Sequence, residues 1–398
     1  MLNGLLEKGR VNVGFIDGQW GSSGKGKFNG TLALGGEIDF AISQNSVNAS
    51  HIVVWNDPTT GNEREYKFQH LPTSVINPKV KAILGAGASI DMKQLLKEIA
   101  DWDMYGRLFI HPNAVVITQD DIDYEKEHLQ RIASTMTGNG AAAARKVMRH
   151  PNTRTASDFP ELAPFVCDTY EKMYSWLAHG QTGILETAQG FDLSMDHGMV
   201  FHNQDGSLHK AYPYCTSRNV DPLTFAGMSG VCKGILGKTF LNLRALPIKV
   251  GDGSNTKVDG YSGVNMAGSN SGPCWPDQDE LSWPDVTAIA GSLTPLLEQT
   301  SLTKRTRRIF SFSLMQLQHI TKIVQPDFIT INFMNYMDHS ISGRHGVMSL
   351  VDLETQHPRV ASMVYMVNKM QYWANTSLAG QVVAIGTGPH DSDIIRLV

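Results

Sequence analysis

The feature that most constrains this chain is a short apolar run that passes directly into a glycine-rich loop. Residues 11–16 read VNVGFI, and the residues that follow read DGQWGSSGKGK. The apolar run predicts a buried strand. The loop glycines let the backbone turn sharply and approach a ligand without a Cβ in the way; they are Gly18, Gly21, Gly24 and Gly26. Backbone N–H groups at such a turn, followed by a helix N-terminus, favour a bound phosphate, and Lys25 can add a positive charge.

Predicted strands and helices alternate along the rest of the chain. Strands are expected at residues 39–43, 51–55, 80–87, 107–110, 183–190, 327–333 and 381–388. Helices are expected at residues 91–102, in the alanine-rich part of 135–150, at 282–293 and at 359–374. This alternation predicts an α/β fold with a mostly parallel central sheet flanked by helices. Residues 252–280 are rich in Gly, Ser and Asn, so we expect a long surface loop there.

Composition excludes several classes of protein. Hydrophobic residues make up 41% and charged residues 18% of the chain, as in a globular protein without membrane spans. The net charge of −4 argues against a general nucleic-acid binder. The N-terminus has no secretion signal, and no apolar run approaches the roughly 18 residues of a membrane helix. The four cysteines are scattered without a C-x-x-C pair, which favours a reducing, cytoplasmic setting without zinc or disulfides.

The glycine-rich loop departs from the usual phosphate-loop pattern, G-x-x-x-x-G-K-[ST]. Gly18 lies one residue too far from Gly24 and Lys25, and Gly26 stands where the pattern has the Ser or Thr that holds Mg²⁺. The loop by itself therefore leaves two interpretations open: a phosphate site in a P-loop-NTPase-like fold, or a plain turn between a strand and a helix.

Short segments in chain order resemble the signatures of one family, the adenylosuccinate synthetases. QWG and GKGK at residues 19–21 and 24–27 resemble Q-W-G-D-E-G-K-G-K, and NASH at 48–51 resembles N-A-G-H. HLPTSVINP at 70–78, STMTGNG at 134–140, KVMR at 146–149 and ETAQG at 186–190 match further motifs in the same order. YPYCTSRN at 212–219, TKRTRR at 303–308 and GTGP at 386–389 continue the series. The resemblance implies one domain of this type over residues 1–398, with inserted functional loops.

The resemblance also implies a reaction. Family members join L-aspartate to the 6-position of a purine nucleotide after a nucleoside triphosphate has phosphorylated the 6-oxygen. A phosphate is a far better leaving group than an amide-like oxygen, so this order of steps is chemically sound. The site must hold several anions together, which calls for Mg²⁺, cationic side chains and backbone N–H groups. The implied cofactor is Mg²⁺, and the implied assembly is a homodimer.

The matching positions assign roles to residues of this chain. The catalytic positions are Ser22, Lys25 and His51. The nucleotide substrate is expected at Ser22, Asn48, Ser134, Thr135, Arg149, Gln189 and Thr216, where Arg149 reaches the nucleotide of the neighbouring subunit. Aspartate is expected at Thr303, Arg305 and Arg307, because arginine forks suit a dicarboxylate. The triphosphate donor is expected at Gly21, Gly24, Lys25, Gly26, Lys27, His51, Asn332, Phe333, Asn335, Gly386, Gly388 and Pro389. The metal ligands are expected to be Ser22 and Ser50.

Three departures from the family pattern bear on function. Ser22 replaces the loop aspartate that takes the N1 proton of the purine and helps hold Mg²⁺, and Ser23 replaces the glutamate after it. Ser50 replaces a glycine whose carbonyl oxygen binds Mg²⁺, a milder change because a backbone oxygen remains. Asn335 replaces the aspartate that recognises guanine in the donor, which removes the preference for GTP, since an amide can pair with adenine. Phe333 replaces a lysine and can stack on the base.

With these departures, the sequence resembles the phage branch of the family, the 2-amino-2′-deoxyadenylosuccinate synthetases. That branch uses dGMP in place of IMP and adenine nucleotides as donors. The resemblance therefore predicts a ligase for dGMP, L-aspartate and ATP or dATP in the host cytoplasm. In this hypothesis Ser22 leaves room beside the 2-amino group of the purine, and the acceptor of the N1 proton stays unassigned. Two alternatives remain at this stage: an adenylosuccinate synthetase for IMP and GTP, and a nucleotide-binding regulator without activity.

Overall fold

The structure is a computed structural model of the whole chain. It describes residues 2, 4–44, 47–56, 60–129, 135–194, 196–198, 201–202, 208–209, 226–227, 230–249, 251, 274–300, 304, 306–373 and 380–398. Four residues expected in the site, Ser134, Thr216, Thr303 and Arg305, lie outside the described residues.

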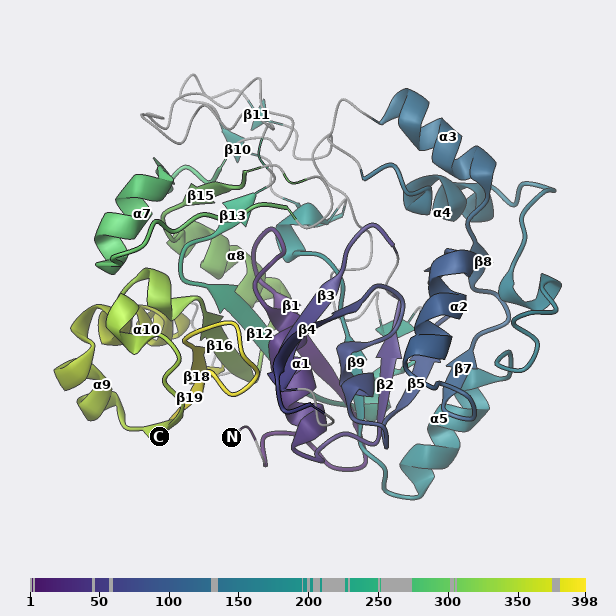
Figure 1. Cartoon of the computed structure of the whole chain (residues 1–398), viewed down its shortest axis with the longest axis horizontal. Helices are drawn as coiled ribbons and strands as arrows, with labels where there is room; N and C mark the ends of the chain where they lie inside the picture. The colour runs from purple at the N-terminus through teal and green to yellow at the C-terminus, as the bar shows by residue number, and fades with distance from the viewer. Residues whose placement is uncertain are drawn as a thin grey trace.

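One ten-stranded sheet runs through the molecule (Figure 1). From edge to edge its strands are β17 (Gly346–Met348), β19 (Ile394–Leu397), β18 (Gln381–Gly386), β16 (Phe328–Asn332), β12 (Leu236–Arg244), β1 (Val11–Asp17), β9 (Gly183–Glu186), β2 (Phe40–Ser43), β5 (Lys81–Leu84) and β7 (Leu108–Ile110). All neighbouring strands pair in parallel except β18 and β19. The expectation of a mostly parallel sheet is confirmed.

Smaller sheets surround this central one. The hairpin of β3 (His51–Asn56) and β4 (Glu63–Phe68) is antiparallel. A three-stranded antiparallel sheet consists of β13 (Ile248–Lys249), β15 (Arg308–Phe310) and β14 (Glu280–Leu281). Two short pairs complete the set: β6 (Ser89–Ile90) with β8 (Val115–Val116), and β10 (Phe201–His202) with β11 (Leu208–His209).

Helices cover both faces of the central sheet. They are α1 (Lys25–Leu34), α2 (Met92–Asp101), α3 (Gln119–His128), α4 (Asn139–Val147), α5 (Thr169–Ala178), α7 (Trp283–Ala290), α8 (Leu314–Val324), α9 (Leu350–Gln356) and α10 (Pro358–Trp373). Ile320 of α8 and Val364 of α10 share a buried cluster with Ile16 of β1. Phe28 of α1 stacks on Phe15, the preceding strand residue, at 5.0 Å between ring centroids. Since successive strand side chains point to opposite faces, α1 and the α8–α10 pair lie on opposite sides of the sheet.

The expected elements form where the sequence patterns place them. The helix expected from Asp91 is capped by the Asp91 side chain, which accepts a hydrogen bond from the Gln94 amide. The alanine-rich segment forms α4, with Gly138 in the left-handed conformation before it. Within the described residues, no helix is long and apolar enough to span a membrane.

Of the surface loop expected at residues 252–280, residues 252–273 lie outside the described residues, and residues 274–279 are loop, with one large side chain buried. There Trp275 is buried at 1% exposure in a cluster with Trp20 and Phe310. Its indole Nε1 donates a 2.6 Å hydrogen bond to the carboxylate of Asp192, and β14 begins at Glu280. The large apolar ring overrides the polar composition around it, because burial of an indole stabilises the fold strongly.

Candidate active site

The residues expected to carry the chemistry lie at the carboxyl ends of adjacent strands. The glycine-rich loop follows β1, Gln189 follows β9, Arg244 ends β12, Asn332 ends β16 and Gly386 ends β18. These strands are neighbours in the central sheet, in the order β18-β16-β12-β1-β9. In parallel α/β sheets ligands bind at this edge, so the topology gathers segments that are far apart in sequence into one site.

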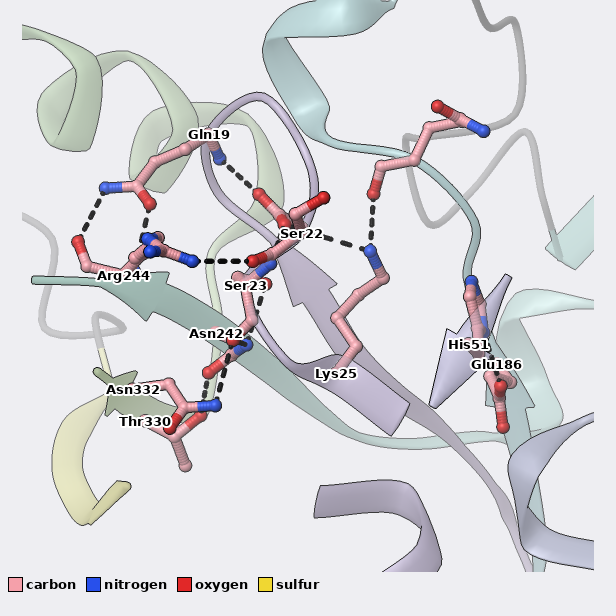
Figure 2. Close-up of polar contacts among 12 residues, drawn as sticks. Gln19, Ser22, Ser23, Lys25, His51, Glu186, Asn242, Arg244, Thr330 and Asn332 are labelled. Carbon is pink, nitrogen blue, oxygen red and sulfur yellow. Dashed lines mark hydrogen bonds and ion pairs between the residues drawn. The ribbon is translucent and has the colours of Figure 1, made fainter. Parts of the chain in front are cut away.

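The phosphate-type loop is held by amide side chains from β12 and β16. Asn242 Nδ2 donates to the Ser23 carbonyl at 2.9 Å and to the Ser23 hydroxyl at 2.8 Å, and Asn332 Nδ2 donates to the same carbonyl at 3.0 Å (Figure 2). Gly24 has φ +81°, and a Cβ there would collide with the Asn332 side chain. Only glycine fits this position, and the hydrogen bonds from the two amide side chains hold one side of the loop.

Gly26 explains why this loop lacks the usual Ser or Thr after its lysine. A Cβ at this position would lie 2.8 Å from the Ile52 carbonyl oxygen. The absent side chain lets β3 approach the first turn of α1. This approach brings His51, the first residue of β3, beside the loop.

Lys25 lies almost completely buried between two oxygen partners. Its Nζ donates a 2.7 Å hydrogen bond to the Gln189 carbonyl and lies 3.8 Å from Asp17 Oδ2. Burial lowers the pKa of Lys25, whereas the carboxylates of Asp17 and Glu186 act in the opposite direction. The Asp17 carboxylate also accepts hydrogen bonds from the amides of Gln19 at 2.8 Å and Ser23 at 3.2 Å. A buried carboxylate thus balances the lysine and shapes the loop from beneath.

His51 is oriented by a fully buried carboxylate. Its Nδ1 lies 2.7 Å from Glu186 Oε1. Glu186 Oε2 accepts from the Thr73 amide at 2.9 Å and from the Thr73 hydroxyl at 2.8 Å. Thr73 begins the 3₁₀ helix η1 (Thr73–Ile76). Since Glu186 holds one ring nitrogen, the opposite nitrogen Nε2 is the one directed away from this carboxylate.

Left-handed backbone conformations concentrate in the predicted site. Among the described residues, eight non-glycine residues have positive φ, and four of them were expected in the site: Ser22, Arg149, Gln189 and Phe333. Ser22, with φ +55°, is exposed at the tip of the loop. Non-glycine residues pay about 1–3 kcal/mol for such conformations, which cluster at ligand sites. Strain in Ser22, Gln189 and Phe333 therefore marks the edge where β1, β9 and β16 end.

The residues expected to bind the donor lie at the ends of β16 and β18. Lys27 Nζ donates to the carbonyls of Gly388 at 2.8 Å and Asp393 at 3.0 Å. Burial lowers the pKa of Lys27 to about 7. Through these two hydrogen bonds, Lys27 connects α1 to the segment after β18. Phe333 and Asn335 are half-buried beside them.

The other predicted residues are placed less centrally. Asn48 and Ser50 are half-buried before β3, and Thr135 is half-buried before α4, where its hydroxyl lies 3.3 Å from that of Thr137. Arg149 is exposed just beyond the end of α4. Arg307 precedes β15, and its amide donates to the Glu298 carbonyl at 2.9 Å. Burial lowers the pKa of Arg307, Glu298 opposes this effect, and the nearby Arg244 adds to it.

Sequence reasoning missed three charged residues of the site: Asp17, Glu186 and Arg244. All are at most 1% exposed, and each is the last residue of its strand. The available signal was a charged residue at the end of an apolar strand, which marks the ligand-binding edge of a parallel sheet. Their partners come from segments distant in sequence, so that signal does not specify their contacts.

The two metal ligands that the sequence predicts, Ser22 and Ser50, are neutral. Within the described part of the chain, no group of three or more His, Cys, Asp or Glu side chains is arranged to hold a metal ion. Mg²⁺ prefers oxygen ligands and commonly uses one or two carboxylates together with substrate phosphates. Ser22 is exposed at the loop tip, whereas Asp17 is engaged by two loop amides. These oxygen ligands therefore fit Mg²⁺ only in combination with nucleotide phosphates.

Fold and site together define a nucleotide-dependent α/β enzyme, with a phosphate-type loop, a buried lysine and an oriented histidine at the carboxyl edge of a parallel sheet. The sequence profile described as adenylosuccinate synthetase matches residues 15–159. A Vibrio phage phiVC8 protein named N6-succino-2-amino-2′-deoxyadenylate synthase is 32% identical, over 81% of this chain and 85% of that protein. The chain belongs to the adenylosuccinate synthetase family and is an enzyme of its ligase class.

Further relatives support this assignment. The protein of the same name from Acinetobacter phage SH-Ab 15497 is 30% identical, over 80% of this chain and 83% of its own length. The solved structure of the cyanophage S-2L succinoaminodeoxyadenylate synthetase, bound to dGMP and to dATP as an energy donor, matches with a TM-score of 0.71 and 26% identity. That match covers 97% of this chain and 95% of the cyanophage chain. A fully ligated Plasmodium falciparum adenylosuccinate synthetase shares the fold, with a TM-score of 0.70.

Proposed function

We propose that this chain joins L-aspartate to the 6-position of dGMP, with ATP or dATP as the phosphoryl donor. The product is 2-amino-2′-deoxyadenylosuccinate, a precursor of diaminopurine DNA. The observation that carries the proposal is Ser22. It places a small neutral hydroxyl, exposed at the loop tip, where the family pattern has an aspartate. The phage relatives named for this product, and the dGMP- and dATP-bound cyanophage structure, support the choice of substrates.

The proposed reaction has two steps. The γ-phosphoryl group of the donor passes to the 6-oxygen of the purine as N1 loses its proton, and the nucleoside diphosphate leaves. The amine of aspartate then attacks C6, and phosphate departs with the electrons of the C6–O bond. The first step needs positive charge and hydrogen-bond donors around the transferring group, because charge on its oxygens must be stabilised in the transition state.

Each of these requirements is assigned to residues of this chain. Lys25 supplies the ammonium group, and His51 presents a ring nitrogen whose orientation Glu186 fixes. Ser22 borders the 2-amino side of the purine, and Arg307 contributes to the aspartate carboxylate site with Thr303 and Arg305. Mg²⁺, held by the phosphates with the Ser22 hydroxyl and the Ser50 carbonyl, would neutralise phosphate charge.

The donor end of the site supports an adenine nucleotide. Asn335 offers an amide, which can both donate to and accept from the adenine edge, and Phe333 offers an aromatic face.

The exposed Arg149 beyond α4 is the residue that we place across a homodimer interface. We place the reaction in the cytoplasm, in line with the scattered cysteines of the sequence.

The test is a matrix of substrates with the purified protein. Phosphate release and product mass are measured with dGMP or IMP, with ATP, dATP or GTP, and with or without aspartate. The proposal expects aspartate-dependent release with dGMP and an adenine donor. Release only with IMP and GTP would assign the ordinary family reaction instead, and no release with any mixture would indicate a nucleotide-binding protein without activity.

A further inference from the structure

Arg244 is an arginine with no exposed surface at the centre of the ligand edge. Its Nε donates to the Leu246 carbonyl at 2.8 Å. Its Nη1 donates to the Ser22 carbonyl at 3.1 Å (Figure 2). Its Nη2 forms an ion pair with Glu298. A fully buried arginine is costly unless its donors are satisfied, so these contacts fix the plane of the guanidinium group.

The backbone of Arg244 is also fixed, by Gln19 of the phosphate-type loop. The Arg244 amide donates to Gln19 Oε1 at 2.9 Å, and Gln19 Nε2 donates to the Arg244 carbonyl at 3.1 Å. Together with the bond from Nη1 to Ser22, this reciprocal pair attaches the end of β12 to the loop at two points. Arg244 and the loop therefore move as one unit.

The guanidinium plane lies against the ring of Phe333. The distance from Arg244 Cζ to the ring centroid is 3.6 Å, which is close stacking. Phe333 adopts φ +61°, an unfavourable conformation for a bulky side chain, directly after β16. Its amide donates to Asn332 Oδ1 at 3.0 Å. Stacking on Arg244, and packing against Tyr336 whose ring centroid lies 5.6 Å away, hold the ring in a defined orientation, and Phe333 is half-buried at the end of β16.

Glu298 links this pair to the expected aspartate loop. Its Oε1 accepts a 2.7 Å hydrogen bond from the Tyr336 hydroxyl as well as the ion pair from Arg244. Its carbonyl accepts from the Arg307 amide. Arg244 thus contacts the loop that carries Ser22 and the segment that carries Phe333, and it reaches the stem of the aspartate loop through Glu298.

We infer that Arg244 is a positioning residue for the triphosphate donor, holding Phe333 face-on as the platform on which the donor base stacks and tying that platform to the phosphate-type loop. The inference rests on the proposed function in that it places the donor base at Phe333. Base stacking on an aromatic side chain contributes substantially to binding and depends on the orientation of the ring. The planar guanidinium supports the ring from behind, a role that a lysine ammonium does not fill.

The first test is Arg244→Lys, which keeps the positive charge beside Glu298 and removes the planar group. Binding of the non-hydrolysable donor AMP-PNP and of dGMP is measured separately by calorimetry. We expect the AMP-PNP Kd to rise about tenfold, in the range of a lost stacking contact, while the dGMP Kd changes less than about threefold. Equal weakening of both ligands, or an unchanged AMP-PNP Kd, would overturn the inference.

A second variant guards against misfolding. Arg244→Met combined with Glu298→Gln removes the buried charge pair as a unit, so neither partner of this pair is left without the other. It is compared in the native and the Phe333→Leu background. If Arg244 acts through Phe333, the loss of AMP-PNP affinity is about tenfold in the native background and less than about twofold after Phe333→Leu. The same loss in both backgrounds would contradict the inference.

The matched control is Arg107→Met. Arg107 is a half-buried arginine, and its guanidinium donates to the carbonyls of Val75, Val80 and Trp102, away from the strand ends of the site. This variant should lower the melting temperature and leave both Kd values unchanged.

A GMP-PNP arm separates this inference from the proposed function. If the native protein binds GMP-PNP and not AMP-PNP, the proposed donor class is wrong. A selective loss of GMP-PNP affinity in Arg244→Lys would then still support the role of Arg244. If the native protein binds neither analogue, the inference fails with the proposed donor site.

Discussion

The contact between Glu186 and His51 gives the sharpest prediction for catalysis, through the change Glu186→Gln. The Glu186 carboxylate accepts three hydrogen bonds, one at Oε1 from His51 and two at Oε2 from Thr73. Glutamine has a single acceptor oxygen. If that oxygen takes the two Thr73 donors, the NH₂ group faces His51 Nδ1, and the neutral imidazole must then carry its proton on Nε2.

The expected magnitude follows from this geometry. If the imidazole does not change tautomer, two donors face each other in a buried site, at a cost of about 1–3 kcal/mol in stability. If it does, the Nε2 atom that we place at the transferring phosphoryl group changes its hydrogen-bonding character. Since one hydrogen-bond donor to the charge that develops in a transition state typically contributes about 10²–10³-fold, we expect kcat to fall about 10²-fold or more. The KM for dGMP should change less than about threefold.

The assay pairs steady-state kinetics with ¹⁵N NMR of the His51 ring, which reads its tautomer directly. Glu98→Gln is the matched control. Glu98 is 2% exposed and accepts from the amides of Gln69, His70 and Leu71, outside the strand ends of the site. It should lose stability and keep kcat. A Glu186→Gln variant with kcat within threefold of the native value would refute the assigned role of this pair.

Three further predictions concern the loop and the donor site. Ser22→Asp should lower turnover of dGMP relative to IMP, because the larger anion occupies the space beside the 2-amino group; equal or higher dGMP selectivity would contradict the steric account. Asn335→Asp should shift the ATP/GTP ratio of kcat/KM toward GTP, since a carboxylate accepts from guanine, and an unchanged ratio would refute the assignment. Asp17→Asn removes the carboxylate that opposes the effect of burial on Lys25, so the pKa of Lys25 should fall further. The alkaline limb of kcat/KM should then move to lower pH, and a uniform loss at every pH would indicate a purely structural role.

The fold class and the position of the loop followed from local patterns. An apolar run before clustered glycines predicted β1 and the turn into α1, and Asp91 marked the start of α2. These features depend on neighbours within a few residues, which the sequence displays directly. Within the surface loop expected at residues 252–280, the burial of Trp275 was not predicted, because it depends on Trp20 and Phe310, which lie far away in the chain.

The sequence by itself determined the order of the strands along the chain, the glycine positions that the loop requires and the neutral side chain at Ser22. Only the tertiary structure decided which side chains the buried charged groups contact. Arg244 and Phe333 stack because β12 pairs with β16, and Glu186 reaches Thr73 across 113 positions of sequence. Such contacts follow from the lateral order of strands in the sheet, a non-local property that the packing of the whole core selects. Local residue patterns carry no record of that order, and the chemistry of the site depends on it.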